Sequence, residues 1–354
     1  YRLNLSFDVT KQKRIEHSSE LWVWHLLGLI SPMVIISGNL IGDYWTLAGT
    51  ILVLGIYPLL DFACGDSVPS RTNPTVPRSL QWIIYAHVVL VVAVACSLCW
   101  RAYSDGNAWT TWAAALASGI NTGVSGFIVA HELGHRRPGS LSWWLARLNL
   151  AIGQYLHFTV EHNRHHHVVV ATAVDPASAP RGRGLWSHVV RTVPLQFLSA
   201  WQISSRRELS WYRNSVLHGV LIQAAILLLL WQNLSIWVAG ALLAHSVVSI
   251  LLLEYVNYLQ HYGLRRNEGA KQSEMDSWQS GARWSRWTLL ELPLHPAHHL
   301  KPTQPFWQHT KYADAPTLPT GYYGLFWACL IPPLWRRWIH PLLPNIDSFS
   351  IKGN

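Results

Sequence analysis

Six apolar stretches, each as long as a membrane-spanning helix, are the feature that most limits how this chain folds. A helix needs roughly 20 apolar residues to cross the ~30 Å hydrocarbon core of a bilayer. The 354-residue chain is 50% hydrophobic and only 13% charged, as is typical of membrane proteins. We therefore expect an all-α membrane protein with six transmembrane helices. The predicted spans are Leu21–Gly42, Trp45–Ala63, Leu80–Trp100, Trp109–Ala130, Val216–Leu234 and Ile236–Tyr258.

The positive charges predict how these spans are oriented. If the first span runs outward, residues 1–20, 64–79, 131–215 and 259–354 lie on the cytoplasmic side and hold 26 of the 27 lysines and arginines. Because cytoplasmic loops retain lysine and arginine, we expect both termini in the cytoplasm. The chain then forms one domain, 1–354. Its parts are a cytoplasmic N-terminal segment (1–20), six spans with a cytoplasmic loop (21–258, loop 131–215) and a C-terminal cap (259–354).

Nine of the 19 histidines fall in four short motifs at or beyond the predicted cytoplasmic ends of the spans. On a helix, the two histidines of HELGH point the same way one turn apart, as a metal clamp requires, and His162 and His166 repeat that spacing. Imidazole binds several metals, but nine histidines exceed the three or four that one zinc ion uses, so we expect two ions. The nine candidate ligands are His131, His135, His162, His166, His167, His261, His295, His298 and His299.

Other interpretations of these motifs stay open at this point. HELGH alone is typical of zinc peptidases, in which Glu132 would activate a metal-bound water, but a peptidase leaves the histidines of EHNRHHH and HPAHH unexplained. A membrane metal carrier also uses clustered histidines, although pairs fixed one turn apart favour a rigid site. The formal net charge of +9 suits anionic lipid or an acidic protein, and no recognised nucleic-acid motif accompanies it.

The ordered set of motifs resembles one family. HELGHRR, EHNRHHH followed by VATAVDPASAP, NYLQHYGLRR, HPAHHLKP, LPTGYYGLF and IPPLW, with PLLDFACGD in the second span, resemble in order and spacing the integral-membrane alkane monooxygenases of bacteria. The resemblance covers about residues 45–345. It implies a cytoplasmic histidine-rich cap whose nine histidines hold a nonheme diiron site. It also implies hydroxylation of the terminal methyl group of medium or long-chain alkanes with O2, in the bacterial inner membrane.

The same resemblance implies outer partners for the ligands and shows three departures. His165 stands where the family usually has glycine, Gln260 where it has glutamate before HYG, and Ala297 where it has aspartate. Gln260 resembles the related xylene monooxygenases, which hydroxylate aromatic methyl groups, so an alkylarene substrate stays open. Outer-shell carboxylates and amides fix the tautomer of a ligating histidine. The expected partners are Asp61, Glu132, Glu161, Asp175, Asn257 and Gln260.

An oxygenase of this kind needs two electrons from outside the chain. The sequence has no GxGxxG fingerprint and no paired CxxC motifs, so we expect a separate rubredoxin or ferredoxin with its reductase, docking on the arginine-rich face. An apolar substrate would enter from the lipid. The residues expected along its path are Val53, Gly55, Ile56, Gly123 and Phe127. A membrane fatty acyl desaturase or hydroxylase shares the histidine boxes and is a further alternative, which QHYG and LPTGYYGLF disfavour.

Overall fold

The computed structural model describes residues 21–67, 79–207 and 210–344. The expected N-terminal segment 1–20 and residues 345–354 of the expected cap lie outside the described residues. Within them the chain forms helices, turns and two isolated bridges, and no strand. The prediction of an all-α protein is confirmed.

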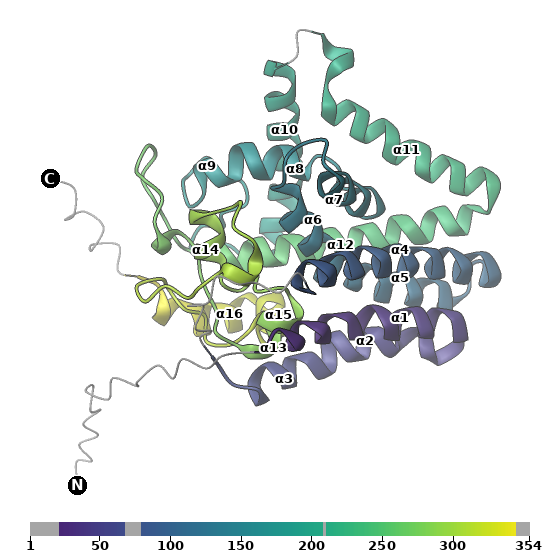
Figure 1. Ribbon diagram of the computed structural model, residues 1–354, viewed down its shortest axis with the longest axis horizontal. Coiled ribbons are helices and arrows are strands. Elements are labelled where there is room, and N and C mark those ends of the chain that lie inside the picture. Colours follow the sequence, from purple (N-terminus) through teal and green to yellow (C-terminus); the bar gives the residue numbers. More distant parts are fainter. Residues whose placement is uncertain (1–20, 68–78, 208–209, 345–354) are drawn as a thin grey trace, which may run out of the picture.

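Six helical segments are long and apolar enough to cross a membrane, which confirms the predicted number. In Figure 1 most of them run side by side, whereas the fifth runs obliquely to the others. In chain order the spans are η1 (Trp22–Leu29) with α1 (Ile30–Ile41); η2 (Asp43–Leu47), α2 (Ala48–Ile51), η3 (Leu52–Ile56) and α3 (Tyr57–Ala63); α4 (Ser79–Asp105); α5 (Trp109–Asn121), η4 (Thr122–Gly126) and α6 (Phe127–Gly134); α11 (Ser215–Asn233); and α12 (Ile236–His261).

Three spans end later than their apolar sequence predicts. The third ends at Asp105 rather than Trp100, and the other two continue into the histidine motifs. The fourth ends at Gly134 rather than Ala130, and the sixth ends at His261 rather than Tyr258. We placed the predicted end of each span at the last residue of its apolar stretch. In the fourth and sixth spans most of the polar residues that follow are buried, so the helices continue. As a result, His131 and His261 stand on the ends of long, packed helices.

The fourth span occupies the centre of the bundle, whereas the fifth lies at its edge. In the most apolar part of each span, 89% of the fourth is buried inside the protein, against 11% of the fifth. Glycines allow α12 to approach the fourth span closely. A Cβ on Gly119 would lie 2.6 Å from the carbonyl oxygen of His245, and one on Gly123 would lie 2.7 Å from the Cβ of Leu252. The HELGH motif is therefore carried by the best-packed span.

The remaining helices gather at one end of the spans and form a cap (Figure 1). One of them, α10, runs across the direction of the spans. The cap elements are α7 (Leu141–Ile152), α8 (Phe158–Glu161), η5 (His162–His166), α9 (His167–Val169), α10 (Leu185–Arg207), η6 (Trp211–Arg213), η7 (Glu274–Asp276), α13 (Arg283–Thr288), α14 (His295–Leu300), η8 (Phe306–Gln308), α15 (Tyr322–Leu330), α16 (Pro332–Ile339) and η9 (His340–Leu342).

Buried polar contacts fix the cap to the first two spans. Asp61, near the end of the second span, accepts hydrogen bonds from the amide and hydroxyl of Ser285 at 2.9 and 2.8 Å. In the cap, Arg286 pairs with Glu291 at 2.7 Å, and Glu291 also contacts His25 of the first span at 3.0 Å. Because removing one partner of a buried ion pair costs roughly 3–5 kcal/mol, these contacts hold the cap in register with the spans. Asp61 therefore bonds the cap in this structure and not a candidate metal ligand.

Candidate metal centre

The nine histidines singled out in the sequence converge at the junction of the spans and the cap. They form two groups, and within each group one ring nitrogen per residue lies within 4.8 Å of all the others. The five-histidine group is His131, His135, His162, His167 and His298; the four-histidine group is His166, His261, His295 and His299.

Two of the histidine pairs follow the spacing expected for an α-helix. His131 is the fifth residue of α6 and His135 caps that helix, and both belong to the five-histidine group. His295 and His299 are one turn apart on α14 and share the four-histidine group, with their Nε2 atoms 2.9 Å apart. Side chains at i and i+4 lie on one face of a helix, so each pair is set by local geometry.

His162 and His166 depart from that expectation and lie in different groups. The segment that carries them, η5, is a π-helical turn, in which hydrogen bonds join residues five apart rather than four. Consistent with this longer repeat, His162 meets His167, and their Nε2 atoms are 3.0 Å apart. His166 then faces the other group. The π-helical turn thus lets one short segment supply both groups.

The ring nitrogens fit bound metal ions. Nitrogens that share one ion at about 2.1 Å lie about 3 to 3.4 Å from one another. The contact between His295 and His261 measures 3.2 Å, and the contact between His298 and His167 measures 3.0 Å. In addition, the buried Nε2 atom of His166 has no hydrogen-bond partner in the described residues. Because buried polar atoms are normally satisfied, this nitrogen is positioned for a ligand.

Burial favours the neutral form, which metal ligands require, for imidazoles of both groups. Burial, together with the neighbouring histidines, holds the pKa of His162, His295 and His298 well below the usual range. The same burial, with Arg136 as a further cause, lowers the pKa of His135 to about 4. The site therefore offers uncharged nitrogen donors near neutral pH.

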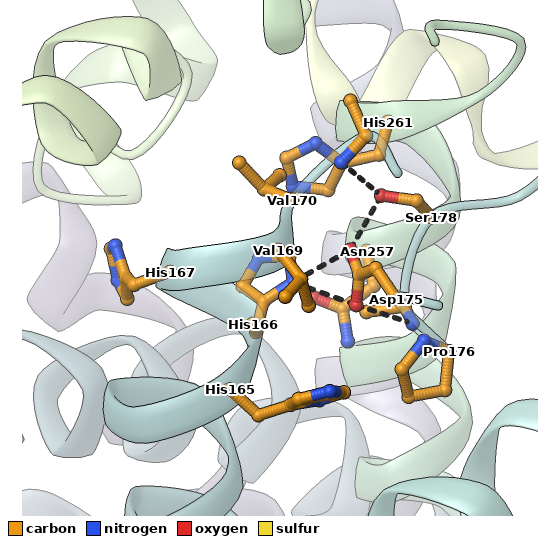
Figure 2. A network of polar contacts seen from close by, with 12 residues as sticks. His165, His166, His167, Val169, Val170, Asp175, Pro176, Ser178, Asn257 and His261 are labelled. Carbon is orange, nitrogen blue, oxygen red and sulfur yellow. Dashed lines mark hydrogen bonds and ion pairs between the residues drawn. The ribbon is translucent and has the colours of Figure 1, made fainter. Parts of the chain in front are cut away.

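Two members of the four-histidine group have a hydrogen-bond acceptor beside Nδ1, their outer ring nitrogen. His166 Nδ1 lies 3.1 Å from Asp175 Oδ2, and Ser178 donates to the same carboxylate (Figure 2). Burial would raise the pKa of Asp175, but the contacts with His166 and Ser178 outweigh it and keep the pKa lowered. His261 Nδ1 faces the backbone carbonyl of Asp276 at 3.2 Å. That carbonyl was not predicted, because a main-chain acceptor carries no sequence signal.

Two of the other expected partners, Glu132 and Glu161, lie near the histidines but contact different groups. Glu132 accepts from Arg136 at 3.2 Å and from the backbone amide of Phe306 at 3.4 Å. Glu161 contacts Nδ1 of His165 at 3.3 Å, and His165 belongs to neither group. In the described residues, neither carboxylate forms a hydrogen bond with a histidine of the two groups.

The remaining two expected partners, Asn257 and Gln260, bond to span and cap residues. Asn257 donates to Glu254 at 3.1 Å, and Gln260 donates to the hydroxyl of Tyr322 at 3.1 Å. Among the six expected partners, all of which lie in the described residues, only Asp175 forms a hydrogen bond with a histidine of the two groups. The other contacts were not foreseen because they depend on which side chains the fold brings near.

Two narrow cavities lead from the spans toward the histidines, each with a volume of about 30 Å³. The inner one is lined by His131, His162 and His295, and so reaches both groups. The outer one is lined mainly by apolar side chains of the second, fourth and sixth spans and of α15. Gly123 and Ile128 line both cavities.

Three of the five expected path residues line these cavities. Gly123 borders both, Phe127 the inner one and Val53 the outer one. Gly55 and Ile56 line neither, and 44% of Ile56 is exposed on the outer surface of the second span. These two residues lie beside Val53 in sequence, but successive side chains of a helix point in different directions.

Comparison with known proteins agrees with this architecture. Residues 107–341 match the fatty acid desaturase family model. The chain is 30% identical to alkane 1-monooxygenase 1 of Alcanivorax borkumensis, over 98% of this chain and 95% of the relative. It is also 30% identical to alkane 1-monooxygenase 1 of Pseudomonas aeruginosa, over 90% and 89%. Identity to the xylene/toluene monooxygenase hydroxylase component of Pseudomonas putida is 24%, over 88% and 86%. This multi-pass membrane protein with paired histidine groups therefore belongs to the alkane 1-monooxygenase family, within the fatty acid desaturases, and is a monooxygenase-type oxidoreductase.

Proposed function

We propose that this protein hydroxylates the terminal methyl group of medium or long-chain alkanes, using O2 and two iron ions held by the nine histidines. The observation that carries the proposal is the pair of histidine groups at the inner end of an apolar path from the spans. The relatives named alkane 1-monooxygenase support the substrate class. The overall reaction is R–CH3 + O2 + 2 e⁻ + 2 H⁺ → R–CH2OH + H2O.

The metal supplies one part of this chemistry, and the protein supplies the rest. Iron, when bound, activates O2 reductively, which redox-silent zinc does not do. The four-histidine group would hold one ion and the five-histidine group the other. Asp175 orients the ring of His166 by bonding its outer nitrogen, and the carbonyl of Asp276 does the same for His261.

The two cavities explain how an alkane would reach this centre with one end leading. Their walls are largely apolar, and His131, His162 and His295 line the inner end. The alkane chain would therefore lie between the spans, with its terminal carbon at the histidines. At about 30 Å³ each, the cavities are far smaller than the cavity of about 150 Å³ that accommodates benzene. Substrate entry therefore requires side chains such as Ile128 to move apart, which leaves little space for water beside the substrate.

The orientation and partners form part of the same proposal. With both termini in the cytoplasm of a bacterial inner membrane, the cap faces the cytoplasm and the whole chain acts as one domain. The substrate then comes from the lipid, and the electrons come from rubredoxin or ferredoxin and its reductase.

One observation favours a second candidate, an alkylarene methyl hydroxylase. Gln260, which precedes His261 in the chain and is also a feature of the xylene-type sequences, donates to the Tyr322 hydroxyl. However, the identity to the xylene/toluene enzyme is 24%, against 28–30% to the alkane enzymes. A zinc peptidase is disfavoured, because Glu132 already bonds Arg136 and the backbone amide of Phe306, and because a peptidase leaves the four-histidine group unexplained.

The first experiment is metal analysis of the detergent-purified protein, followed by turnover assays. We expect about two irons per chain, as two histidine groups require. Supplied with rubredoxin, its reductase and O2, the protein should convert octane and longer alkanes to primary alcohols, with less product from p-xylene. One zinc and no iron, after expression with ample iron, would contradict the proposal. Faster oxidation of p-xylene than of any alkane would favour the second candidate.

A further inference from the structure

A basin on the surface of the cap has no role in the substrate path. It has a volume of about 410 Å³ and lies between α10, the loop that follows α9 and the chain after α12. Four arginines line it: Arg183, Arg191, Arg206 and Arg265. We propose that this basin is the docking site for the acidic electron-carrier protein. This proposal rests on the proposed function, which needs such a carrier.

The arginines of the basin are largely unpaired within the protein. In the described residues, the side chains of Arg183, Arg191 and Arg206 form no ion pair or hydrogen bond, and Arg265 donates only to the backbone carbonyl of Thr172. Burial, followed by the nearby charges of Arg191 and Arg265, lowers the pKa of Arg183. A cluster of like charges is costly unless an anion compensates it. The basin is therefore suited to the carboxylates of an acidic partner.

The one carboxylate in the basin wall does not neutralise these arginines. Asp175 lines the basin, yet its oxygens are occupied by His166, Ser178 and the backbone amide of Ala177. The side chain is almost completely buried. The surface that a partner meets is thus strongly positive.

A second basin of similar size, about 390 Å³, is less suitable. It lies beside His135 and is also lined by arginines, but two of them are committed to internal contacts. Arg136 pairs with Glu132, and Arg147 donates to the backbone carbonyl of Leu156 at 2.7 Å. Its positive charge is therefore partly used within the protein.

The rim of the first basin has the composition of a protein interface. Leu195 and Leu198 on α10 are 39% and 51% exposed, and Val174 is 51% exposed. Arginine beside exposed apolar side chains is typical of protein interfaces, where the apolar part supplies affinity and the charges supply steering. A small soluble protein with acidic residues around an apolar patch would match this surface.

The position of the basin makes it useful for electron transfer. Asp175 belongs to its wall, and its Oδ2 atom lies 3.1 Å from Nδ1 of His166 in the four-histidine group. A carrier bound here is separated from that group by one side chain and one hydrogen bond. Each carrier molecule delivers one electron and is itself oxidised by one electron. Two docking events therefore supply the two electrons of the balanced reaction.

The test is the double variant Arg191→Glu/Arg206→Glu, with Arg207→Glu as the matched control. All three arginines are exposed on α10, but Arg207 does not line the basin. We would measure the Kd of purified, oxidised rubredoxin for the detergent-solubilised holoenzyme from about 50 to about 200 mM salt. The double variant should weaken binding at least ~10-fold and flatten its salt dependence, whereas the control should change Kd by less than ~2-fold. Iron content should stay unchanged in all variants.

Two results would overturn the proposal. One is a Kd that is unchanged in the double variant, or equally weakened in Arg207→Glu, since either would show that the basin itself is not the contact. The other is a selective loss of binding to phosphatidylglycerol vesicles with carrier binding intact, which would make the basin a lipid site. Because binding is measured with oxidised carrier and no alkane, a failure of alkane turnover would contradict the proposed function without affecting this result.

Discussion

The two histidine groups differ in how their ligands are held. In the five-histidine group, His131, His135 and His167 are only partly buried, and no described residue bonds an outer ring nitrogen through a carboxylate or carbonyl. In the four-histidine group every member is buried, and His166 and His261 each have such an acceptor. The five-histidine group has one more nitrogen donor than the other group. In the four-histidine group, hydrogen bonds orient the rings of His166 and His261. Donor number and ring orientation are thus alternative ways to secure a metal.

The groups also meet the substrate path unequally. The inner cavity touches His131 and His162 of the five-histidine group but only His295 of the four-histidine group. The arginine-lined basin proposed for docking, in contrast, approaches the four-histidine group through Asp175. In our proposal, substrate therefore arrives mainly beside one group and electrons beside the other.

The largest expected effect is the difference between two single variants, each of which removes one histidine from one of the two groups. His261→Ala leaves three donors in the four-histidine group, so we expect iron to fall from about two to about one per chain and turnover to below about 1%. His135→Ala leaves four donors, so about two irons and at least ~10% of turnover should remain. Metal analysis and alcohol formation measure both. Equal iron loss in the two variants would show that the spare donor has no effect.

The next effect tests the outer partner of His166. Asp175→Asn keeps the shape of the side chain but removes its charge, and we expect iron affinity at the four-histidine group to fall about 10- to 100-fold. Competition with an iron chelator, followed by absorbance, measures it.

Glu161→Gln is the matched control for this substitution. Burial, with Asp175 and Glu254 nearby, raises the pKa of Glu161 well above the usual range, which favours its neutral form, and glutamine has nearly the same shape. Iron affinity should change by less than ~2-fold. A large loss in this variant would instead assign Glu161 to the metal centre.

A smaller effect is expected along the substrate path. Ile128 lines both cavities, so Ile128→Ala should widen the path, shift the preferred alkane length and change KM by about 3- to 10-fold, with iron content unchanged. Ile56→Ala removes the same side chain from an exposed position that lines neither cavity. Product profiles over a series of alkanes check the pair. An identical shift in both variants would contradict the path.

The smallest effect is expected at His165. Its ring is partly exposed, contacts Glu161 and belongs to neither group, so His165→Gly should leave iron content unchanged and alter turnover by less than ~3-fold. Metal analysis beside initial rates measures this. Loss of one iron would make His165 a tenth ligand and would remove the distinction between the two groups.

The membrane spans and most of the candidate ligand positions could be predicted from the sequence, because they depend on local properties of short segments. The six spans are set by the length of their apolar stretches, and His131 and His135 share a group because an α-helix places i and i+4 on one face. The nine candidate ligands could be chosen by residue chemistry and clustering alone. The four-residue spacing of His162 and His166 wrongly predicted that the two side chains form one clamp, because the sequence does not indicate that this segment is a π-helical turn.

Tertiary packing decided what depends on distant neighbours. Gln260 bonds Tyr322, Asp61 bonds Ser285, and the acceptor for His261 is a backbone carbonyl in a separate turn. The arginine-lined basin brings Arg191 of α10 together with Arg265 beyond α12, two residues that no local pattern connects. Apolar length and ligand chemistry are written into short segments, whereas the partners of a buried polar group are set by the segments that the fold brings against it.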